Sequence, residues 1–380
     1  MPVLYFLPWV SCSDKLIVGD LQLTPYERGV RPTDLNGIPL KDIDAILGNY
    51  GNQAYFPSTK VSEPITKATV ITFGTVDSIS DPPEEAIRTC LQAGQQLAFC
   101  GLAKRVFCSH FQYCNTDGYR IVAQRFRIGE GGAIAVTTRR RDGYTSQYLG
   151  DDDRGPRFVR PLHVDGRLSL DIDTALLKGL QAATDPELGD RLSSAISVFL
   201  AANTDAPEVP QRAEIVLLRI AFETLLDATH HTANLVQRFS EHFKNELPSP
   251  PVWHSGKFTE DVWRARWPKV ARPLDAWVND FCDTRNSAAH GPRGSNEAPV
   301  WPPHVHLLFA SWLFPLVVKG VLASAGLYRL TEDDLALRRG FEAFLAHDVL
   351  ARAEVDKPEL RWSKVERSLL FPVWAKTIYS

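Results

Sequence analysis

The stretch WPKVARPLDAWVNDFCDTRNSAAH, residues 267–290, decides the fold expected for the second half of the chain. Its apolar residues recur every three or four positions, which predicts a helix with one buried stripe. The stripe consists of Val270, Leu274, Trp277, Val278 and Phe281. At about 100° per residue, Arg285 falls in the middle of this stripe. A guanidinium group on a buried stripe is costly unless it is paired or faces a polar cleft.

Two more polar residues follow Arg285 on the same predicted helix. Asn286 and His290 are four positions apart and therefore share a neighbouring face. Gly291 and Pro292 are expected to end the helix, which leaves His290 in its last turn. The carbonyl end of the helix dipole favours imidazolium there, which suits a proton donor.

The composition is that of an ordinary globular protein, with 44% apolar and 23% charged residues among 380. A net charge of -3 gives no global attraction to nucleic acid or membrane, so any polyanion site must come from a local cluster. The six cysteines form no Cys-x-x-Cys pair, which argues against a zinc finger, and we expect neither a metal nor a cofactor. Such scattered cysteines suit a reducing cytosol, so we expect a cytoplasmic protein.

The chain changes character near residue 165, and we expect an α+β fold in three parts. Residues 1–165 are predicted to form a strand-rich α+β domain with one helix behind Asp81 and a hairpin at Asp142-Gly143. Residues 166–330 have helical periodicity and predict an all-α bundle, whose apolar stretch 307–326 is interpreted as a buried core helix rather than a membrane span. Residues 331–380 are expected to form a C-terminal helix, capped by Thr331, and a tail.

The segment from Arg285 to His290 resembles the signature of the HEPN superfamily, an Arg followed after four to six residues by His. The preceding stretch AFETLLD, residues 221–227, resembles the Apea-like branch of that superfamily. The resemblance covers roughly residues 185–330 and implies a helical bundle. Active members are metal-independent endoribonucleases in which dimerisation brings two motifs into one cleft, and many are toxins or phage-defence effectors.

The bare spacing is not specific, because two other segments satisfy it. Arg105 to His110 and Arg157 to His163 have the same pattern, but both lie in the strand-rich half, and Pro161 interrupts the second. The context of a helix before the motif and a helix stop after it distinguishes Arg285 and His290.

Metal-free RNA cleavage explains these residue types. It needs a base for the 2'-OH proton, an acid for the leaving 5'-oxygen and a cation against the phosphorane oxygens. The resemblance implies that Arg285 and His290 are catalytic, while Asn286 either orients His290 or donates a hydrogen bond to phosphate. Glu223 is the expected supporting residue. Alternatively, Arg285 forms a structural ion pair with Glu223 or Glu214, an arrangement that is compatible with catalysis.

A second basic region lies in the strand-rich half. Residues 120–160 hold nine Arg, no Lys and five acidic residues. Arg139, Arg140, Arg141 and Tyr144 flank the predicted hairpin turn and are candidate RNA contacts. A solvated edge strand protected by charge explains the same residues.

The leading hypothesis is therefore a metal-independent HEPN endoribonuclease that acts as a homodimer on RNA, as a toxin or an antiviral effector. A regulatory protein or a phage-derived trigger is the expected further partner, and no membrane is expected. The alternative is a non-catalytic HEPN fold that binds RNA or a partner protein.

Overall fold

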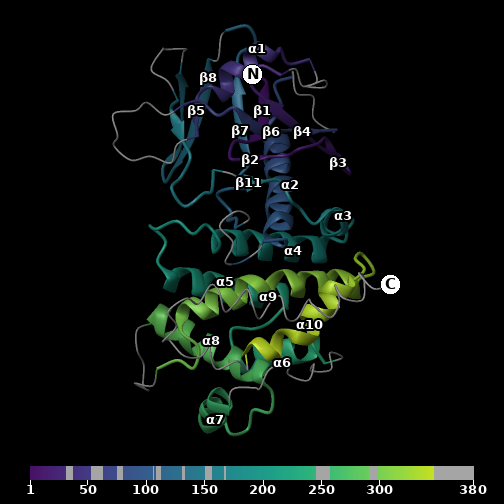
Figure 1. Ribbon diagram of the computed structural model, residues 1–380, viewed down its shortest axis with the longest axis vertical. Helices are drawn as coiled ribbons and strands as arrows, with labels where there is room; N and C mark the ends of the chain where they lie inside the picture. Colours follow the sequence, from purple (N-terminus) through teal and green to yellow (C-terminus); the bar gives the residue numbers. More distant parts are fainter. Residues whose placement is uncertain are drawn as a thin grey trace. The chain divides into compact units, whose positions relative to one another are not determined.

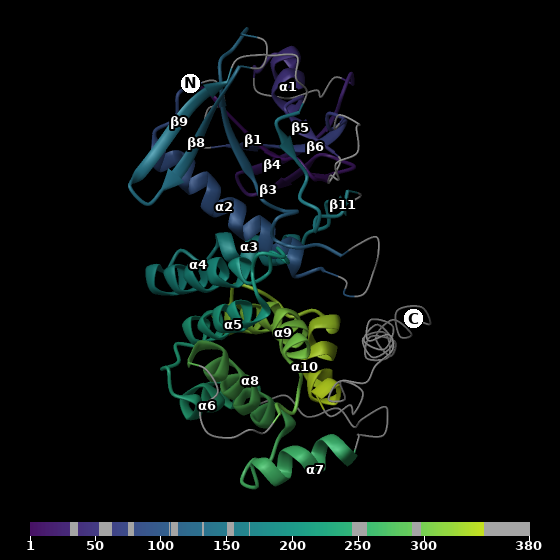
Figure 2. The same cartoon turned by 90° about the vertical axis from the view of Figure 1, so that its left-hand side faces the viewer.

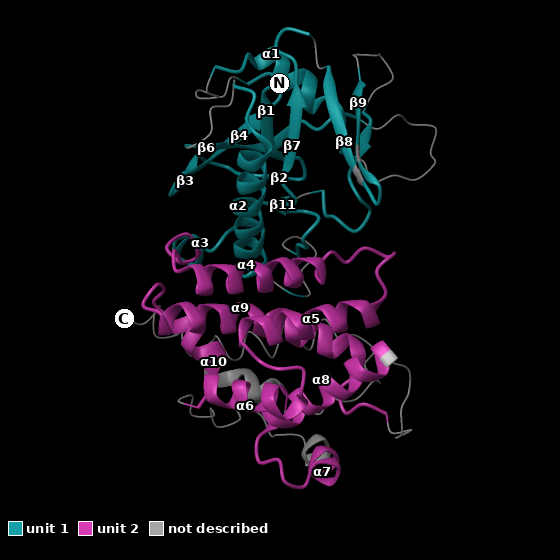
Figure 3. Cartoon of the chain, turned by 180° about the vertical axis from the view of Figure 1, so that it is seen from behind, with its two compact units in different colours: residues 1–178 teal, residues 179–380 magenta. Residues whose placement is uncertain are grey.

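The computed structural model describes residues 1–30, 37–52, 63–74, 80–105, 107, 113–130, 133–149, 156–166, 168–244, 257–290 and 298–345. The chain divides into two compact units, Met1–Lys178 and Gly179–Ser380 (Figure 3). The division falls inside helix α3 (Thr174–Gln181), whereas the sequence changes character at residue 165. Helix α10 (Glu332–Leu345), expected in a separate C-terminal part, belongs to the second unit.

The first unit is built on a seven-stranded antiparallel sheet in the order β3-β4-β6-β1-β7-β8-β9. Its strands are β1 (Val3–Leu7), β3 (Leu16–Val18), β4 (Leu21–Glu27), β6 (Lys67–Phe73), β7 (Val122–Phe126), β8 (Ile134–Arg140) and β9 (Gly143–Leu149). Two short parallel pairs accompany the sheet: β2 (Val10–Ser11) with β11 (Leu168–Ser169), and β5 (Tyr50–Gly51) with β10 (Phe158–Val159). The strand-rich α+β character expected of this half is confirmed.

Helices α1 (Leu40–Leu47) and α2 (Glu84–Leu102) cover opposite faces of the sheet (Figure 2). Leu4 and Phe6 of β1 share one core with Ile43 and Ile46 of α1. Because successive strand residues point to opposite faces, Tyr5 is directed to the other side. The fully buried β1 is therefore the centre of the unit, and the helix expected behind Asp81 is present as α2.

The expected hairpin forms between β8 and β9, with Arg140 paired to Gly143. Gly143 has a φ of +127°, a conformation that residues with a Cβ rarely adopt. The Asp142-Gly143 dipeptide is thus the local reason for the turn.

The second unit is a bundle of helices (Figure 1). Its helices, besides α10, are α4 (Pro186–Ala201), α5 (Gln211–Leu225), α6 (Thr232–His242), α7 (Lys257–Arg266), α8 (Pro273–His290) and α9 (Pro303–Ser324). Asp185 accepts a hydrogen bond from the Leu188 amide at 2.9 Å, and Thr331 accepts one from the Asp334 amide at 3.1 Å. These side-chain caps fix the starts of α4 and α10, and the cap expected at Thr331 is confirmed.

One expectation about α8 is wrong. The buried stripe was extended back to Val270, but the helix begins at Pro273, and Val270 lies in a turn after α7 with its amide bonded to the Trp267 carbonyl at 3.0 Å. Proline is favoured at the first position of a helix because its missing N–H has no partner there anyway. Pro273 therefore starts α8 one turn later than the periodicity suggests.

Helix α9 is the centre of the bundle, because most of its residues are buried, including the continuous run 309–320. Phe314 of α9 stacks on Phe199 of α4 at 4.4 Å between ring centroids and meets Phe222 of α5 at 5.2 Å. Among the described helices, α9 alone is long and apolar enough to cross a membrane, but 83% of its apolar window is buried inside the protein. The interpretation of this stretch as a core helix is confirmed.

Five polar residues connect α10 to the rest of the bundle through hydrogen bonds and an ion pair. We call them the α9–α10 cluster: His242, Lys319, Tyr328, Asp334 and Arg338. Lys319 Nζ lies 2.7 Å from Asp334 Oδ1, and Tyr328 donates to Asp334 Oδ2 at 2.9 Å. Arg338 Nη1 donates to the Leu316 carbonyl at 3.1 Å and lies 3.2 Å from His242 Nε2. The cluster consists of charges that are paired or hydrogen-bonded within the protein.

Candidate functional site

The predicted site residues lie at the end of α8, where the helix leaves the core. Residues Leu274 to Cys282 of this helix are largely buried, whereas Arg285 is half-buried and Asn286 is exposed. The expectation that Arg285 sits in the middle of a buried stripe is therefore wrong. The buried part of α8 ends about one turn before Arg285, so the last turn offers its side chains to solvent.

The organising residue of this region is Arg219 on α5, of which only 1% is exposed. Its Nε donates to Glu223 Oε1 at 2.8 Å, its Nη1 to Asn286 Oδ1 at 3.0 Å and its Nη2 to the His230 carbonyl at 2.7 Å. Every nitrogen of this guanidinium therefore has a partner. Arg219 joins three segments: α5 itself, the end of α8 and the loop before α6.

Arg285 is held differently. Its Nη1 donates to Asn286 Oδ1 at 3.2 Å, while its buried Nε has no hydrogen-bond partner in the described part of the chain. We call Arg219, Glu223, Arg285 and Asn286 the α5–α8 cluster. Among the described residues, a carboxylate pairs with Arg219 but none pairs with Arg285.

The structural ion pair considered for Arg285 is not formed among the described residues. Glu223 is bound to Arg219 instead, with its side chain 15% exposed. Glu214 makes no ion pair with Arg285 within the described ranges either. Burial, and then the negative charge of Asp205, raise the pKa of Glu214 to about 7. Within the described part of the chain, neither Glu223 nor Glu214 therefore neutralises the charge of Arg285.

Asn286 has its amide oxygen occupied twice, by Arg219 and by Arg285. Both partners are pure donors, which fixes Oδ1 as the atom that faces them. The amide NH₂ group consequently points away from both guanidinium groups and can donate to an anion. Of the two roles considered for Asn286, this arrangement supports donation to phosphate.

His290 is part of the last turn of α8, but its side chain lies outside the described residues. Two of the candidate RNA contacts, Arg139 and Tyr144, also have side chains outside the described set. Arg140 pairs with Asp142 at 3.0 Å, and Arg141 is exposed. These hairpin residues belong to the first unit, whereas Arg285 and Asn286 belong to the second.

The two other Arg-to-His segments differ from the α8 motif. His163 Nε2 lies 2.8 Å from Asp117 Oδ2, in a half-buried pair within the first unit. His110 lies outside the described residues.

Arg219 is the residue that the sequence analysis missed. A signal exists, because Arg219 and Glu223 are four positions apart in the largely apolar segment 215–227. An opposite-charge pair at this spacing on a buried face indicates a buried ion pair. Its contact with Asn286, 67 positions away, has no such signal.

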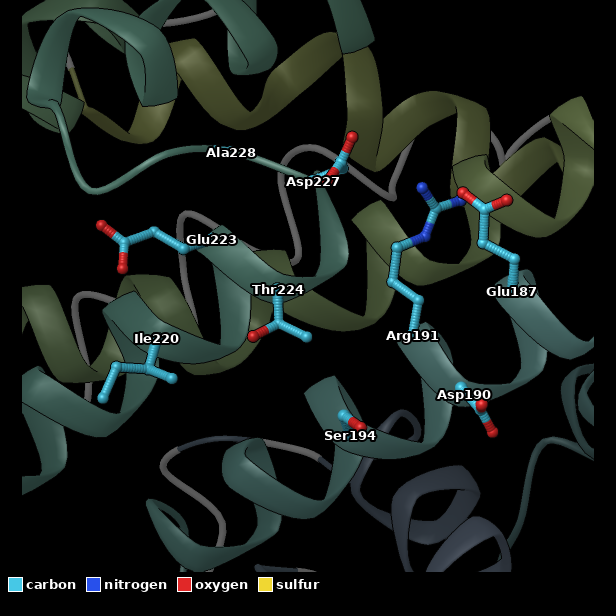
Figure 4. A pocket seen from close by; sticks show the side chains of 9 residues that line it. All are labelled: Glu187, Asp190, Arg191, Ser194, Ile220, Glu223, Thr224, Asp227 and Ala228. Carbon is cyan, nitrogen blue, oxygen red and sulfur yellow. The ribbon is translucent and has the colours of Figure 1, made fainter.

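A pocket of about 460 Å³ lies beside the cluster, between α4 and α5 (Figure 4). Glu187, Asp190, Arg191 and Ser194 line it from α4, and Ile220, Glu223, Thr224, Asp227 and Ala228 from α5 and the residues that follow. Four of these residues are acidic and one is basic, and two of the carboxylates have partners outside the lining: Glu223 pairs with Arg219 and Asp227 with Arg238. Carboxylates still outnumber guanidinium groups around the pocket, which makes it unsuited to phosphate. Neither here nor elsewhere in the described residues is a group of three or more His, Cys, Asp or Glu arranged to hold a metal ion.

Comparison with known proteins gives no match: no family model, no curated protein and no solved structure is similar to this chain. Function must therefore be argued from the α5–α8 cluster itself.

Proposed function

We propose that the second unit is a metal-independent endoribonuclease of the HEPN type that acts as a homodimer. The observation that carries the proposal is that the two arginines of the α5–α8 cluster, Arg219 and Arg285, have different partners. Glu223 pairs with Arg219, so the guanidinium of Arg285, beside the outward amide of Asn286, has no carboxylate partner among the described residues. A permanently charged fork next to a hydrogen-bond donor suits a phosphodiester.

In the proposed reaction, the 2'-oxygen attacks the adjacent phosphorus and the bond from phosphorus to the 5'-oxygen breaks. The products are a 2',3'-cyclic phosphate and a 5'-hydroxyl. Arg285 and the Asn286 amide stabilise the charge on the non-bridging oxygens. One copy of His290 accepts the 2'-OH proton, and the copy from the second protomer donates a proton to the leaving 5'-oxygen.

The cellular role belongs to the same proposal and is supported by the HEPN resemblance and the two-unit division. The protein acts in the cytoplasm as a toxin or phage-defence effector. The first unit holds the nuclease in check or senses a regulatory protein or phage-derived trigger. The β8–β9 hairpin, with Arg139, Arg140, Arg141 and Tyr144, contributes to RNA contact.

The test is cleavage of mixed tRNA and mRNA in EDTA, with wild type compared with His290→Ala and Arg285→Ala. We expect cleavage to persist in EDTA, to leave 2',3'-cyclic phosphate ends and to fall by about 10²–10⁴-fold in His290→Ala. The matched control is His304→Ala, which removes an exposed histidine at the start of α9. Equal cleavage by wild type and His290→Ala, or complete loss in EDTA, contradicts the proposal.

The alternative function, a non-catalytic HEPN fold that binds a partner, is favoured by one observation. The pocket in Figure 4 has an excess of carboxylates even with Glu223 paired to Arg219 and Asp227 to Arg238, which suits a cationic segment of a protein rather than RNA. This alternative predicts that no RNA is cut under any condition, and that Asp190→Asn with Asp227→Asn weakens binding of a poly-lysine peptide.

A further inference from the structure

The loop between α5 and α6 carries two adjacent histidines that the proposed reaction does not use. His230 and His231 are both exposed, and their rings lie 4.0 Å apart between centroids with an interplanar angle of 40°. Sequence alone gives them no significance, since two histidines in a loop are ordinary. Their place relative to the α5–α8 cluster is what distinguishes them.

Hydrogen bonds fix the backbone of this loop on both sides of the pair. The His230 carbonyl accepts from Arg219 Nη2 at 2.7 Å, and the His231 carbonyl accepts from the Asn234 amide at 3.0 Å. The Thr229 amide donates to Asn234 Oδ1 at 2.8 Å. The two imidazoles are therefore presented to solvent from a backbone that is held in one position, as a preorganised binding surface requires.

The same guanidinium that holds His230 also holds Asn286. Arg219 Nη1 lies 3.0 Å from Asn286 Oδ1, and its Nη2 lies 2.7 Å from the His230 carbonyl. A guanidinium group is smaller than a nucleotide. The backbone that carries the histidine pair and the side chain of Asn286 are thus held by the two Nη atoms of one guanidinium, so we expect the nucleotide next to a phosphate at Arg285 and Asn286 to lie near the pair.

We infer that His230 and His231 form a nucleotide-binding subsite, which stacks the base next to the scissile phosphate of single-stranded RNA. This inference rests on the proposed nuclease function and names its substrate as unpaired RNA. Aromatic side chains bind unstacked bases through their flat faces, with little dependence on base identity. The carboxylates of the α4–α5 pocket repel the phosphate backbone, so the strand runs over the histidine pair rather than into that pocket.

The variants that test the subsite leave the fold intact. His231 precedes the first residue of α6, but its side chain makes no capping hydrogen bond, so its removal costs no cap. The test variant is the double substitution His230→Ala with His231→Ala, and His304→Ala is the matched exposed-histidine control. The double substitution His230→Phe with His231→Phe keeps flat aromatic faces. Unchanged thermal unfolding midpoints are expected for all three.

Binding is measured first, by fluorescence anisotropy of a labelled single-stranded oligoribonucleotide with the full chain carrying His290→Ala. Adding the double alanine substitution should raise Kd about tenfold, as loss of base stacking does elsewhere. The phenylalanine pair and the His304→Ala control should leave Kd within about twofold. An unchanged Kd in the double alanine variant, or no RNA binding by any of these proteins, overturns the inference.

Cleavage then separates this inference from the proposed function. In the protein that keeps His290 and carries only the double alanine substitution, KM for RNA cleavage should rise about tenfold, while kcat stays within about twofold. A fall in kcat at constant KM means that the pair transfers protons instead, and the stacking role is wrong. If wild type cuts no RNA but its binding depends on the pair, the nuclease proposal fails and the subsite remains.

Discussion

The α5–α8 cluster and the α9–α10 cluster each contain a buried arginine, but they differ in how completely their charged groups are hydrogen-bonded. In the α9–α10 cluster, Arg338 is 4% exposed and bonded to the Leu316 carbonyl, while Lys319 and Asp334 are paired. In the α5–α8 cluster, Arg219 is equally buried and satisfied, but Arg285 next to it keeps a buried Nε without a partner among the described residues.

This difference separates a structural group from a candidate site. Buried polar atoms are nearly always hydrogen-bonded, so a closed set of partners indicates a role in holding helices together. A buried polar atom without a hydrogen-bond partner, such as Arg285 Nε, is costly, and its retention calls for an explanation such as a functional role. The comparison predicts that damage to the α9–α10 cluster acts on stability, whereas damage to the α5–α8 cluster acts on activity.

The largest expected effect on stability comes from Asp334→Ala. This change leaves Lys319 buried without its carboxylate and removes the acceptor of Tyr328. Breaking a buried ion pair from one side costs about 3–5 kcal/mol of unfolding free energy, which urea denaturation can measure.

Asp333→Ala is the matched control, because Asp333 is the exposed neighbour in the same first turn of α10. Loss of an acidic residue near a helix start should cost about 0.3–1 kcal/mol. Equal losses for both variants would show that Asp334 acts through the helix dipole alone, and that the cluster is not a structural fastening.

The second effect is the pH dependence of the α9–α10 cluster. Burial, and then the positive charge of Arg338, lower the pKa of His242 to about 3 from its ordinary value of 6.5. The folded protein therefore keeps this histidine neutral, and the unfolded chain takes up a proton as the pH falls below 6.5. Stability should decline between pH 6.5 and pH 3, by at most about 1.4 kcal/mol per pH unit.

Urea unfolding across this range, compared between wild type and His242→Gln, checks the effect. In His242→Gln, the unfolding free energy should no longer decline between pH 6.5 and pH 3 through this histidine, even if the variant is less stable overall. Glu214 acts in the opposite direction, because its pKa is raised to about 7, so its contribution is lost as the pH rises from 4.5 to 7. A combined variant with Glu214→Gln isolates the histidine. An unchanged slope would mean that His242 is solvated as well in the folded protein as in the unfolded chain.

The sequence predicted what local patterns determine. The starts of α4 and α10 follow from single capping residues, and α9 follows from a long, predominantly apolar stretch. The surroundings of Arg285 were predicted wrongly, because periodicity gives the direction of a side chain and not the point at which covering helices end.

The polar contacts of the site lie beyond such patterns. The bond from Arg219 to Asn286 joins residues far apart in the chain and depends on how α5 packs against α8. The histidine pair acquires meaning only through Arg219, which holds its backbone. Long-range packing of this kind has no signature in one sequence.

Replacing the buried arginine of each cluster by lysine should change stability less than Asp334→Ala does. These two variants compare the clusters most directly. Arg219→Lys keeps the charge beside Glu223 but loses the fork that also reaches Asn286 and His230. The expected cost is about 1–2 kcal/mol of stability, since two hydrogen bonds are lost. Because Asn286 and the loop are then free to shift, we expect kcat for RNA cleavage to fall about tenfold or more.

Arg338→Lys should cost a similar free energy and leave kcat unchanged, because that arginine holds only structural partners. Arg212→Lys, on the exposed side of α5, should change neither quantity. Equal losses of kcat in Arg219→Lys and Arg338→Lys would show that activity follows stability, and the distinction between the two clusters would not hold. A loss confined to Arg219→Lys would assign the positioning of Asn286 to a buried residue that never touches the substrate.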